Sequence, residues 1–113
     1  MKERLDEMFL DDILESIEAI EEFSINITIK ELSINRMKKN AIIRELEIIG
    51  EASKNISDSI KDNSSIKWSK IIGVRNIVIH RYFRIDLDAV LGIINKDIPE
   101  LKKEVQRIKR GLI

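Results

Sequence analysis

The chain has 113 residues, 43% hydrophobic and 35% charged, a length and a mixture that suit one domain with a single core under a solvated surface. It contains no cysteine, which excludes disulfides, thiolate zinc sites and a cysteine nucleophile. Its formal net charge is zero, so the total charge indicates no general attraction to nucleic acid. We expect a single domain over residues 1–113.

The N-terminal sequence MKERLDEMFLDD is charged from its second residue, and no later run reaches the roughly 18 apolar residues of a membrane span. We therefore expect a cytoplasmic protein with no membrane contact. The chain has one histidine and no Gly-rich phosphate loop. We accordingly expect no metal site and no cofactor.

The first half of the chain predicts two helices and a connector. Residues 3–23 form an amphipathic helix, because apolar residues recur three or four apart among acids. The apolar stripe of this helix consists of Leu5, Met8, Phe9, Ile13, Ile17 and Ile20. In residues 24–35 isoleucines alternate as in a strand, but no partner strand exists, so we expect a connector with a helical turn and capping box at Thr28 to Glu31.

Residues 35–56 show the clearest helical pattern. Its core positions recur at heptad spacing, and Ile43 and Ile48 widen the apolar face. The heptad positions are Ile42, Leu46, Ile49, Ser53 and Ile56. Gly50 in this helix indicates a close approach of another segment, since an interior glycine otherwise costs about 1 kcal/mol; Glu51 beside it has no assigned role.

The second half predicts a polar loop at residues 57–65, a helical turn at residues 66–73 with Trp68 as a core or interface anchor, and a helical motif segment to about residue 83. Asp86 resembles an N-cap, and Pro99 should start or kink the last helix. The expected fold is an all-α antiparallel bundle of four to five helices.

Charge is unevenly distributed. Residues 1–23 carry nine acids against Lys2 and Arg4, whereas residues 63–85 contain five basic residues and no acid. Besides Arg75, the basic residues of this second stretch are Lys67, Lys70, Arg81 and Arg84, and we expect these four to bind RNA phosphates. The basic run at 102–110 is better explained by the dipole of a helix C-terminus.

The stretch RNIVIHRY at residues 75–82 contains the lone histidine, His80, and the lone tyrosine, Tyr82. RNA carries its own nucleophile, the 2′-hydroxyl, so cleavage needs a proton acceptor or donor that titrates near neutrality and a cation for the charge on phosphorus. His80 and Arg75 supply these two functions. Arginine suits the second because its planar fork grips two phosphate oxygens.

Helix geometry supports this site only in part. At about 100° per residue, Asn76 and His80 share a face and Arg75 nearly coincides with Tyr82, but Arg75 and His80 lie about 140° apart. To meet at one phosphate they need the length of the arginine, a helix that starts near residue 75, or a second subunit. A symmetric dimer would also supply a second acid/base group.

The motif Arg, four residues, His, one residue, Tyr resembles the signature of HEPN-domain proteins, specifically the HepT-like toxins of HepT/MntA (type VII) toxin–antitoxin pairs. The resemblance extends over LEIIGEASKNIS at residues 46–57, WSKIIGVRNIVIHRYFRID at residues 68–86 and VLGIINKDIPELKKEV at residues 90–105. Residues 24–40 match less clearly. The resemblance implies one HEPN-like helical domain.

The resemblance also implies an activity and its partners. HEPN toxins are homodimers that cleave RNA without metal, using the arginine and histidine of the motif, here Arg75 and His80, supported by Asn76. In the HepT branch Tyr82 is implied to receive AMP groups from a cognate MntA-like minimal nucleotidyltransferase, the antitoxin. Such groups would occlude and repel an RNA phosphate.

Other interpretations of the same residues remain open. A histidine on a helix is more often structural than catalytic, Arg75 could pair with an acid from another helix, and Tyr82 could be a packing residue. Two alternative functions follow. One is a non-catalytic module that binds a nucleotide or a partner, and the other is a helical dimer that serves as a subunit of a nucleotidyltransferase complex.

Overall fold

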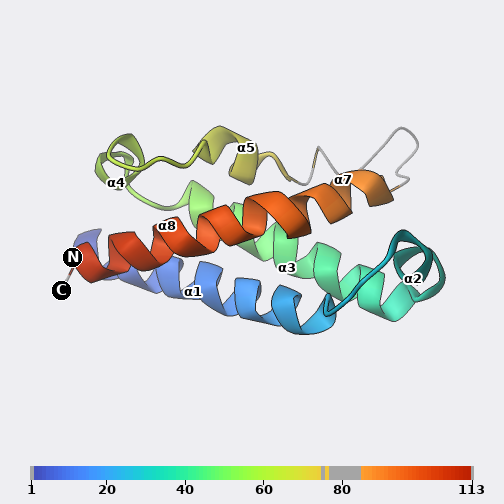
Figure 1. Ribbon diagram of the computed structural model, residues 1–113. Coiled ribbons are helices and arrows are strands. Elements are labelled where there is room, and N and C mark those ends of the chain that lie inside the picture. The colour runs from blue at the N-terminus through green and yellow to red at the C-terminus, as the bar shows by residue number, and fades with distance from the viewer. Residues whose placement is uncertain (1, 75, 77–84, 113) are drawn as a thin grey trace.

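The computed structural model describes residues 2–74, 76 and 85–112 (Figure 1). Its regular elements are helices throughout this part of the chain, so the expected all-α fold is confirmed. In chain order the helices are α1 (Lys2–Phe23), α2 (Ile29–Ile34), α3 (Arg36–Lys54), α4 (Asp58–Asp62), α5 (Trp68–Ile72), α7 (Leu87–Gly92), the π-helical turn η2 (Ile93–Asp97) and α8 (Ile98–Gly111).

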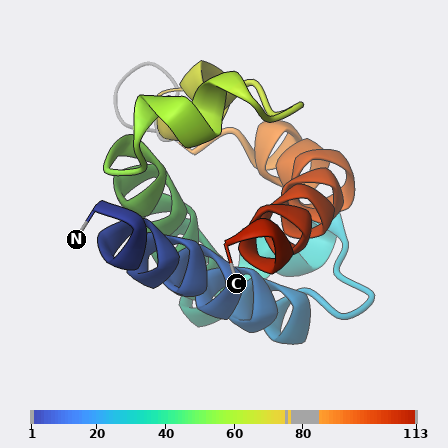
Figure 2. The same ribbon diagram turned by 90° about the vertical axis from the view of Figure 1, so that its left-hand side faces the viewer.

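Three long rods make the bundle. α1 and α3 pack along each other in opposite directions, and α7, η2 and α8 form one rod that returns beside α1 (Figures 1 and 2). The segment with α4 and α5 lies against the carboxyl half of α3, and both chain termini lie at the same end (Figure 1). The rods are joined by long connections, residues 24–35 between α1 and α3 and residues 55–86 between α3 and α7.

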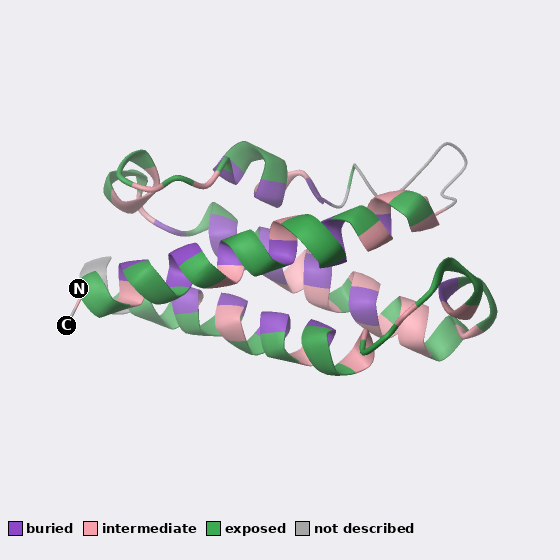
Figure 3. Cartoon of the chain, viewed as in Figure 1, coloured by how far each residue is buried: buried purple, intermediate pink, exposed green. Residues whose placement is uncertain are grey.

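The core follows the inner faces of these rods, seen as a line of buried positions in Figure 3. On α1 the residues Ile13, Ile17 and Ile20 are fully buried, as expected, and so is Leu10. Two further residues of the expected stripe are instead exposed: Leu5 (49% exposed) and Met8 (56% exposed). The spacing argument was wrong there because Met8 points about 140° away from Ile13 on an ideal helix, and Leu5 about 80° away.

The heptad prediction for α3 is confirmed. All five heptad positions are at most 3% exposed, although the helix ends at Lys54 and the last position, Ile56, is buried just beyond it. One of them, Ser53, has a buried hydroxyl oxygen with no hydrogen-bond partner within the described residues. Gly50 also fulfils its expectation, because an added Cβ would lie 3.3 Å from the Ile72 carbonyl oxygen and 3.5 Å from that of Ile71. The glycine therefore lets the end of α5 approach α3.

The connector at residues 24–35 becomes helical where a cap is present. Thr28 Oγ1 accepts a hydrogen bond from the Glu31 amide at 3.1 Å, which starts α2 and confirms the expected turn. The reciprocal half of a capping box is replaced by a salt bridge, since the Glu31 carboxylate binds Lys38 Nζ at 2.5 Å. Asn35 then caps α3 by accepting from the Lys38 amide at 3.0 Å.

The loop expected at residues 57–65 contains a short helix, α4, so that prediction was wrong in its interior. The buried carboxylate of Asp6 in α1 accepts hydrogen bonds from the Ser57 amide at 2.8 Å and the Ser57 hydroxyl at 2.7 Å. This long-range contact holds the residue before α4 in place. Local sequence could not show it, because the two residues are 51 positions apart.

The last rod begins at its predicted cap, and Pro99 stands at the start of its final helix. Asp86 accepts a hydrogen bond from the Ala89 amide at 3.0 Å and starts α7. Pro99 lies in the first turn of α8, directly after the π-helical turn η2, so the hydrogen-bonding pattern of the rod changes just before the residue that lacks an N–H. The helix expected to run to about residue 83 lies outside the described residues.

Candidate functional site

The flanks of the motif are described, but most of the motif is not. Arg75, His80 and Tyr82 lie outside the described residues, and so do two expected RNA contacts, Arg81 and Arg84. Asn76 is described: it is exposed, and its amide donates to the Gly73 carbonyl at 2.9 Å. The roles predicted for all of these residues stay predictions.

The segment that leads into the motif, α5 with Val74, packs against α3, and this packing fixes where the motif begins. Trp68 and Ile71 of α5 and Val74 are buried, and Trp68 donates its indole N–H to the Ser64 hydroxyl at 2.6 Å. The carbonyl groups at the end of α5 rest against the bare backbone of Gly50. Trp68 is therefore a core anchor, and the chain enters the motif from a fixed point.

The two described lysines of the expected RNA surface differ in their surroundings. Lys67, just before α5, is exposed and makes no salt bridge with any described residue. Lys70 donates to Asp97 Oδ1 at 3.0 Å, and the Asp97 side chain is only 13% exposed. Lys70 thus ties α5 to the π-helical turn η2, whereas Lys67 makes no such contact within the described residues.

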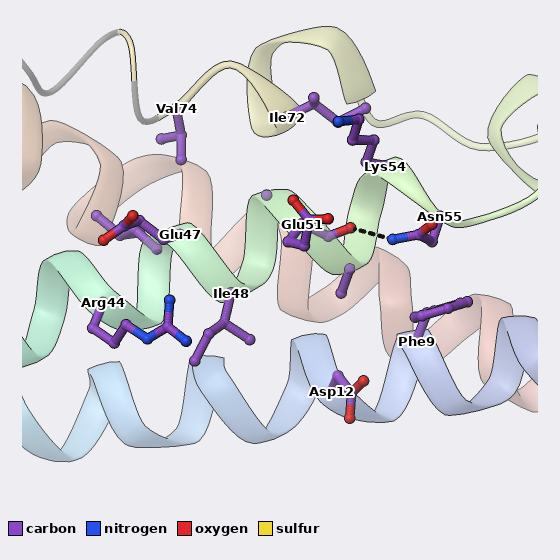
Figure 4. A pocket seen from close by; sticks show the side chains of 13 residues that line it. Phe9, Asp12, Arg44, Glu47, Ile48, Glu51, Lys54, Asn55, Ile72 and Val74 are labelled. Carbon is purple, nitrogen blue, oxygen red and sulfur yellow. Dashed lines mark hydrogen bonds between the residues drawn. The ribbon is translucent and has the colours of Figure 1, made fainter.

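A groove of about 510 Å³ lies between α1, α3 and the chain after α5 (Figure 4). Val74, next to Arg75 in the sequence, lines it, and half-buried Phe9, Ile48 and Ile72 give it an apolar surface. Its polar lining residues are Asp12, Arg44, Glu47, Glu51, Lys54 and Asn55.

The charges of this groove limit what it can bind. Acids and bases are mixed among the described residues that line it, so this part of the lining is not a basic surface. Glu51, for which the sequence indicated no role, lies on its wall, and the Asn55 side-chain amide donates to the Glu51 carbonyl at 2.9 Å (Figure 4). A groove lined by apolar side chains and by charges of both signs resembles the surfaces through which proteins contact each other.

A buried carboxylate on α8 holds the segment that leads into α5. Glu104 accepts hydrogen bonds from the Ser65 amide at 2.6 Å and the Ser65 hydroxyl at 2.8 Å, and it also pairs with the Arg107 guanidinium. The hydrogen bond from Arg107, followed by that from the Ser65 amide, lowers the pKa of Glu104 from 4.5 to about 2. Glu104 is therefore a charged anchor at neutral pH.

Sequence reasoning missed this anchor and the similar contact of Asp6. The signal was present, because each acid occupies an apolar position of its helix. Asp6 precedes Leu10 by four residues, and Glu104 lies three residues after Leu101, both on the buried side. An acid on a buried helix face indicates a partner outside that helix.

The described residues show two absences relevant to function. No helix within residues 2–74 and 85–112 combines the length and apolar character needed to cross a bilayer. In the same part of the chain, no three acidic, histidine or cysteine side chains are grouped closely enough to hold a metal ion.

Comparison with known proteins decides the family. The family model described as "Ribonuclease HepT-like" matches residues 13–108. The chain belongs to the HepT-like ribonuclease family. The resemblance expected from the motif and its flanking blocks is thereby confirmed, as is the expected enzyme class at the level of the family.

Relatives of this HepT-like chain cover nearly its whole length. A protein of Methanocaldococcus jannaschii named as a candidate RNase is 42% identical over 107 residues, which are 94% of this chain and 98% of the relative. A "Probable ribonuclease HepT" of Thermococcus cleftensis is 38% identical over 90% of this chain and 94% of its own length. A candidate RNase of Caldanaerobacter subterraneus subsp. tengcongensis is 35% identical over 88% and 90%. No solved structure matches the chain.

Proposed function

We propose that this HepT-like protein is the toxin of a toxin–antitoxin pair and acts as a metal-independent endoribonuclease in the cytoplasm. The observation that carries this proposal is the family match over residues 13–108, which spans the segment with Arg75 and His80. The names of the relatives agree with RNA as the substrate class. The arginine and histidine of the motif fit this chemistry because RNA supplies its own nucleophile, so no nucleophilic side chain is needed.

The proposed reaction is an internal transfer at phosphorus. The ribose 2′-oxygen forms a bond to phosphorus while the bond from phosphorus to the 5′-oxygen breaks, which leaves a 2′,3′-cyclic phosphate and a free 5′-hydroxyl. His80 takes the proton from the 2′-hydroxyl or gives one to the leaving oxygen. Arg75 binds the phosphate oxygens as their charge grows, and Asn76 supports the site by hydrogen bonding.

A homodimer completes this proposal. One histidine per chain supplies one proton-transfer group, whereas the reaction needs an acceptor and a donor. Two motifs that face each other across a shared cleft would provide both, and would also relax the demand that Arg75 and His80 of one helix meet at the same phosphate.

The RNA path includes the basic residues around the motif. Lys67 is exposed and unpaired among the described residues, so it can bind a phosphate directly. Lys70 must first exchange Asp97 for the phosphate. Arg81 and Arg84 extend the same basic stretch along the chain.

Regulation is proposed to act through Tyr82. The partner is an MntA-like minimal nucleotidyltransferase, the antitoxin, which transfers AMP from ATP to the tyrosine hydroxyl and releases pyrophosphate. The ester places bulk and negative charge two residues from His80, where the RNA phosphate must lie. The toxin is thereby silenced.

Chelator-resistant RNA cleavage tests the activity. We expect the wild-type protein to cut single-stranded RNA in the presence of EDTA, and the His80→Ala protein to lose cleavage while its helical circular dichroism and its oligomeric state are unchanged. An equally active His80→Ala protein would exclude this mechanism. RNA binding that persists without any cleavage in the wild type would favour the non-catalytic binding module instead.

A further inference from the structure

The last helix, α8, carries five basic residues that form one run in the sequence, and the structure divides them between two faces. Lys102 Nζ donates to the two carboxylate oxygens of Glu21 at 3.0 and 2.9 Å, and Lys109 pairs with Asp11. These two lysines therefore belong to the contact between α8 and α1. The other three bases are exposed, and they are Lys103, Arg107 and Arg110.

The three exposed bases form one row along the helix, which we call the α8 row. They stand four and three residues apart, so on an ideal helix they lie within about 60° of one another and extend over about 10 Å. The helix dipole favours cations only within the last turn, and Lys103 lies about two turns before the end of α8. The dipole therefore does not explain the whole row.

A groove of about 500 Å³ lies beside the α8 row, between α8 and the segment that leads into α5. Three contacts hold this segment along the rod of η2 and α8. In order along the segment they are Asn63 with Arg107, Ser65 with Glu104, and Lys70 with Asp97. Because the numbers rise on one side and fall on the other, the two sides of the groove run antiparallel (Figure 1).

The motif connects these two sides in the sequence. The segment at residues 63–74 leads into residues 75–84, and the chain then continues through α7 and η2 into α8. Lys67, which follows the groove residue Ile66, and Lys70 lie on the segment between the groove and the motif. An RNA strand held in the groove is thus bound by the same two elements that flank the motif.

The lining of the groove favours a nucleic acid over a protein. Of its two acids, Glu104 is buried and already bound by Ser65 and Arg107, so only Glu100 is exposed. Its apolar residue Ile66 is half-buried, and the exposed large hydrophobics of the described residues lie elsewhere, within residues 5–8 and 25–37. Protein interfaces have an apolar core, whereas surfaces that bind nucleic acids are polar and positively charged.

We propose that the α8 row and its groove bind the phosphate backbone of RNA outside the motif, as a second binding site for the substrate. This site rests on the proposed ribonuclease function. Lys103 and Arg110 bind phosphates directly, since neither makes a salt bridge with a described residue. Arg107 is oriented by Glu104 and by the Asn63 carbonyl, and its side chain is still 54% exposed, so its remaining N–H groups are available to a further phosphate.

Neutralising two bases of the row tests the site. The variant Lys103→Gln with Arg110→Gln removes two charges and keeps the pair of Arg107 with Glu104. In a His80→Ala background, its slope of log affinity against log salt should fall by about 1.4 for an oligouridine of about 16 nucleotides, which is twice the value for one contact, and its affinity should fall about tenfold. Fluorescence anisotropy at several salt concentrations measures both.

Substrate length gives a second measurement. An oligouridine of about 4 nucleotides is as short as the smallest sites that bind a single strand, so it does not span the motif and the groove together. With His80 present, the ratio of kcat/KM for the long substrate to that for the short one should therefore fall about tenfold in Lys103→Gln with Arg110→Gln. A ratio equal to that of the wild type would overturn the site.

The other face of the same helix supplies a matched control. Lys102→Gln with Lys109→Gln makes the same change in net charge, but both lysines contact α1. This variant should keep the wild-type slope, because the slope counts phosphate contacts. Equal losses in the two variants would show that only total charge matters, and would overturn the site. Circular dichroism and thermal unfolding verify that both variants fold.

The outcomes also separate this site from the proposed nuclease. If Lys103→Gln with Arg110→Gln binds long RNA with the wild-type slope and affinity, the site is wrong and the row is left to a protein partner, while cleavage that depends on His80 still stands. A protein that cuts no RNA but shows the change in slope keeps the site and loses the proposed nuclease.

Discussion

The carboxylate of Glu104 in α8 accepts two hydrogen bonds from one residue, Ser65, through its amide at 2.6 Å and its hydroxyl at 2.8 Å. Trp68, three residues further on, is anchored by a hydrogen bond to Ser64 and by the core. The last long helix thus positions the segment that leads through α5 into the motif. Its charge and its burial make this contact open to direct tests.

Replacing Glu104 by glutamine should lower the free energy of unfolding by about 1–3 kcal/mol, because one of its oxygens no longer accepts and the Arg107 guanidinium loses its counterion. Urea unfolding followed by circular dichroism measures the change. Glu100→Gln, at an exposed position one turn earlier in the same helix, should change stability by less than about 0.5 kcal/mol. Equal effects of the two substitutions would contradict the role of Glu104.

The lowered pKa of Glu104 predicts a pH dependence. The folded-state pKa is about 2, below the ordinary value of 4.5, so the stabilisation by the charged carboxylate is complete above pH 4.5 and is lost as the pH falls from 4.5 toward 2. Unfolding free energies of the wild type and of Glu104→Gln should therefore converge over this interval. If the difference in the free energy of unfolding between the two proteins stays constant down to pH 2, the ionised Glu104 carboxylate is not its cause.

Gly50 and Gly92 offer a matched pair of substitutions. Alanine at Gly92 meets nothing within 4 Å and should stabilise its helix by about 0.5–1 kcal/mol. Alanine at Gly50 places Cβ 3.3 Å from the Ile72 carbonyl oxygen, so the same gain is offset, and Gly50→Val should destabilise by about 2 kcal/mol. Thermal unfolding compares the three variants. A Gly50→Val protein as stable as the wild type would show that α5 can move away from α3 at little cost.

RNA binding should distinguish Lys67 from Lys70. In a His80→Ala background, Lys67→Gln should reduce the slope of log affinity against log salt by about 0.7, the value for one phosphate contact on a single strand. Lys70→Gln should reduce it less, because Asp97 competes for that ammonium group. Asp97→Asn should strengthen binding by releasing Lys70. Fluorescence anisotropy at several salt concentrations measures these slopes, and a Lys67→Gln slope equal to the wild type would exclude that contact.

Tyr82 is testable by mass. Incubation with the cognate MntA-like nucleotidyltransferase and ATP should add AMP units to the wild-type protein and abolish its RNA cleavage, whereas Tyr82→Phe should gain no mass and stay active in the presence of the antitoxin. Intact-protein mass spectrometry and the cleavage assay together decide this. If the Tyr82→Phe protein is modified to the same extent, the residue that accepts AMP is not Tyr82.

Much of the fold could be predicted because its signals are local. Heptad spacing located the core of α3, and the caps at Thr28 and Asp86 began α2 and α7 where expected. The errors arose where orientation mattered. Leu5 and Met8 had helical spacing but face solvent, and the stretch 57–65 had turn residues but encloses α4.

The sequence by itself determined the all-α class, the family and the identity of the motif residues, because helical periodicity, capping side chains and the spacing of Arg75, His80 and Tyr82 are all properties of neighbouring positions. Only the tertiary structure decided which acids become buried anchors and which charges remain free. Asp6 and Glu104 find their serine partners 51 and 39 residues away, and Lys70 finds Asp97 27 residues away. Such partners follow from how the rods pack, since burial makes a carboxylate costly unless distant donors reach it.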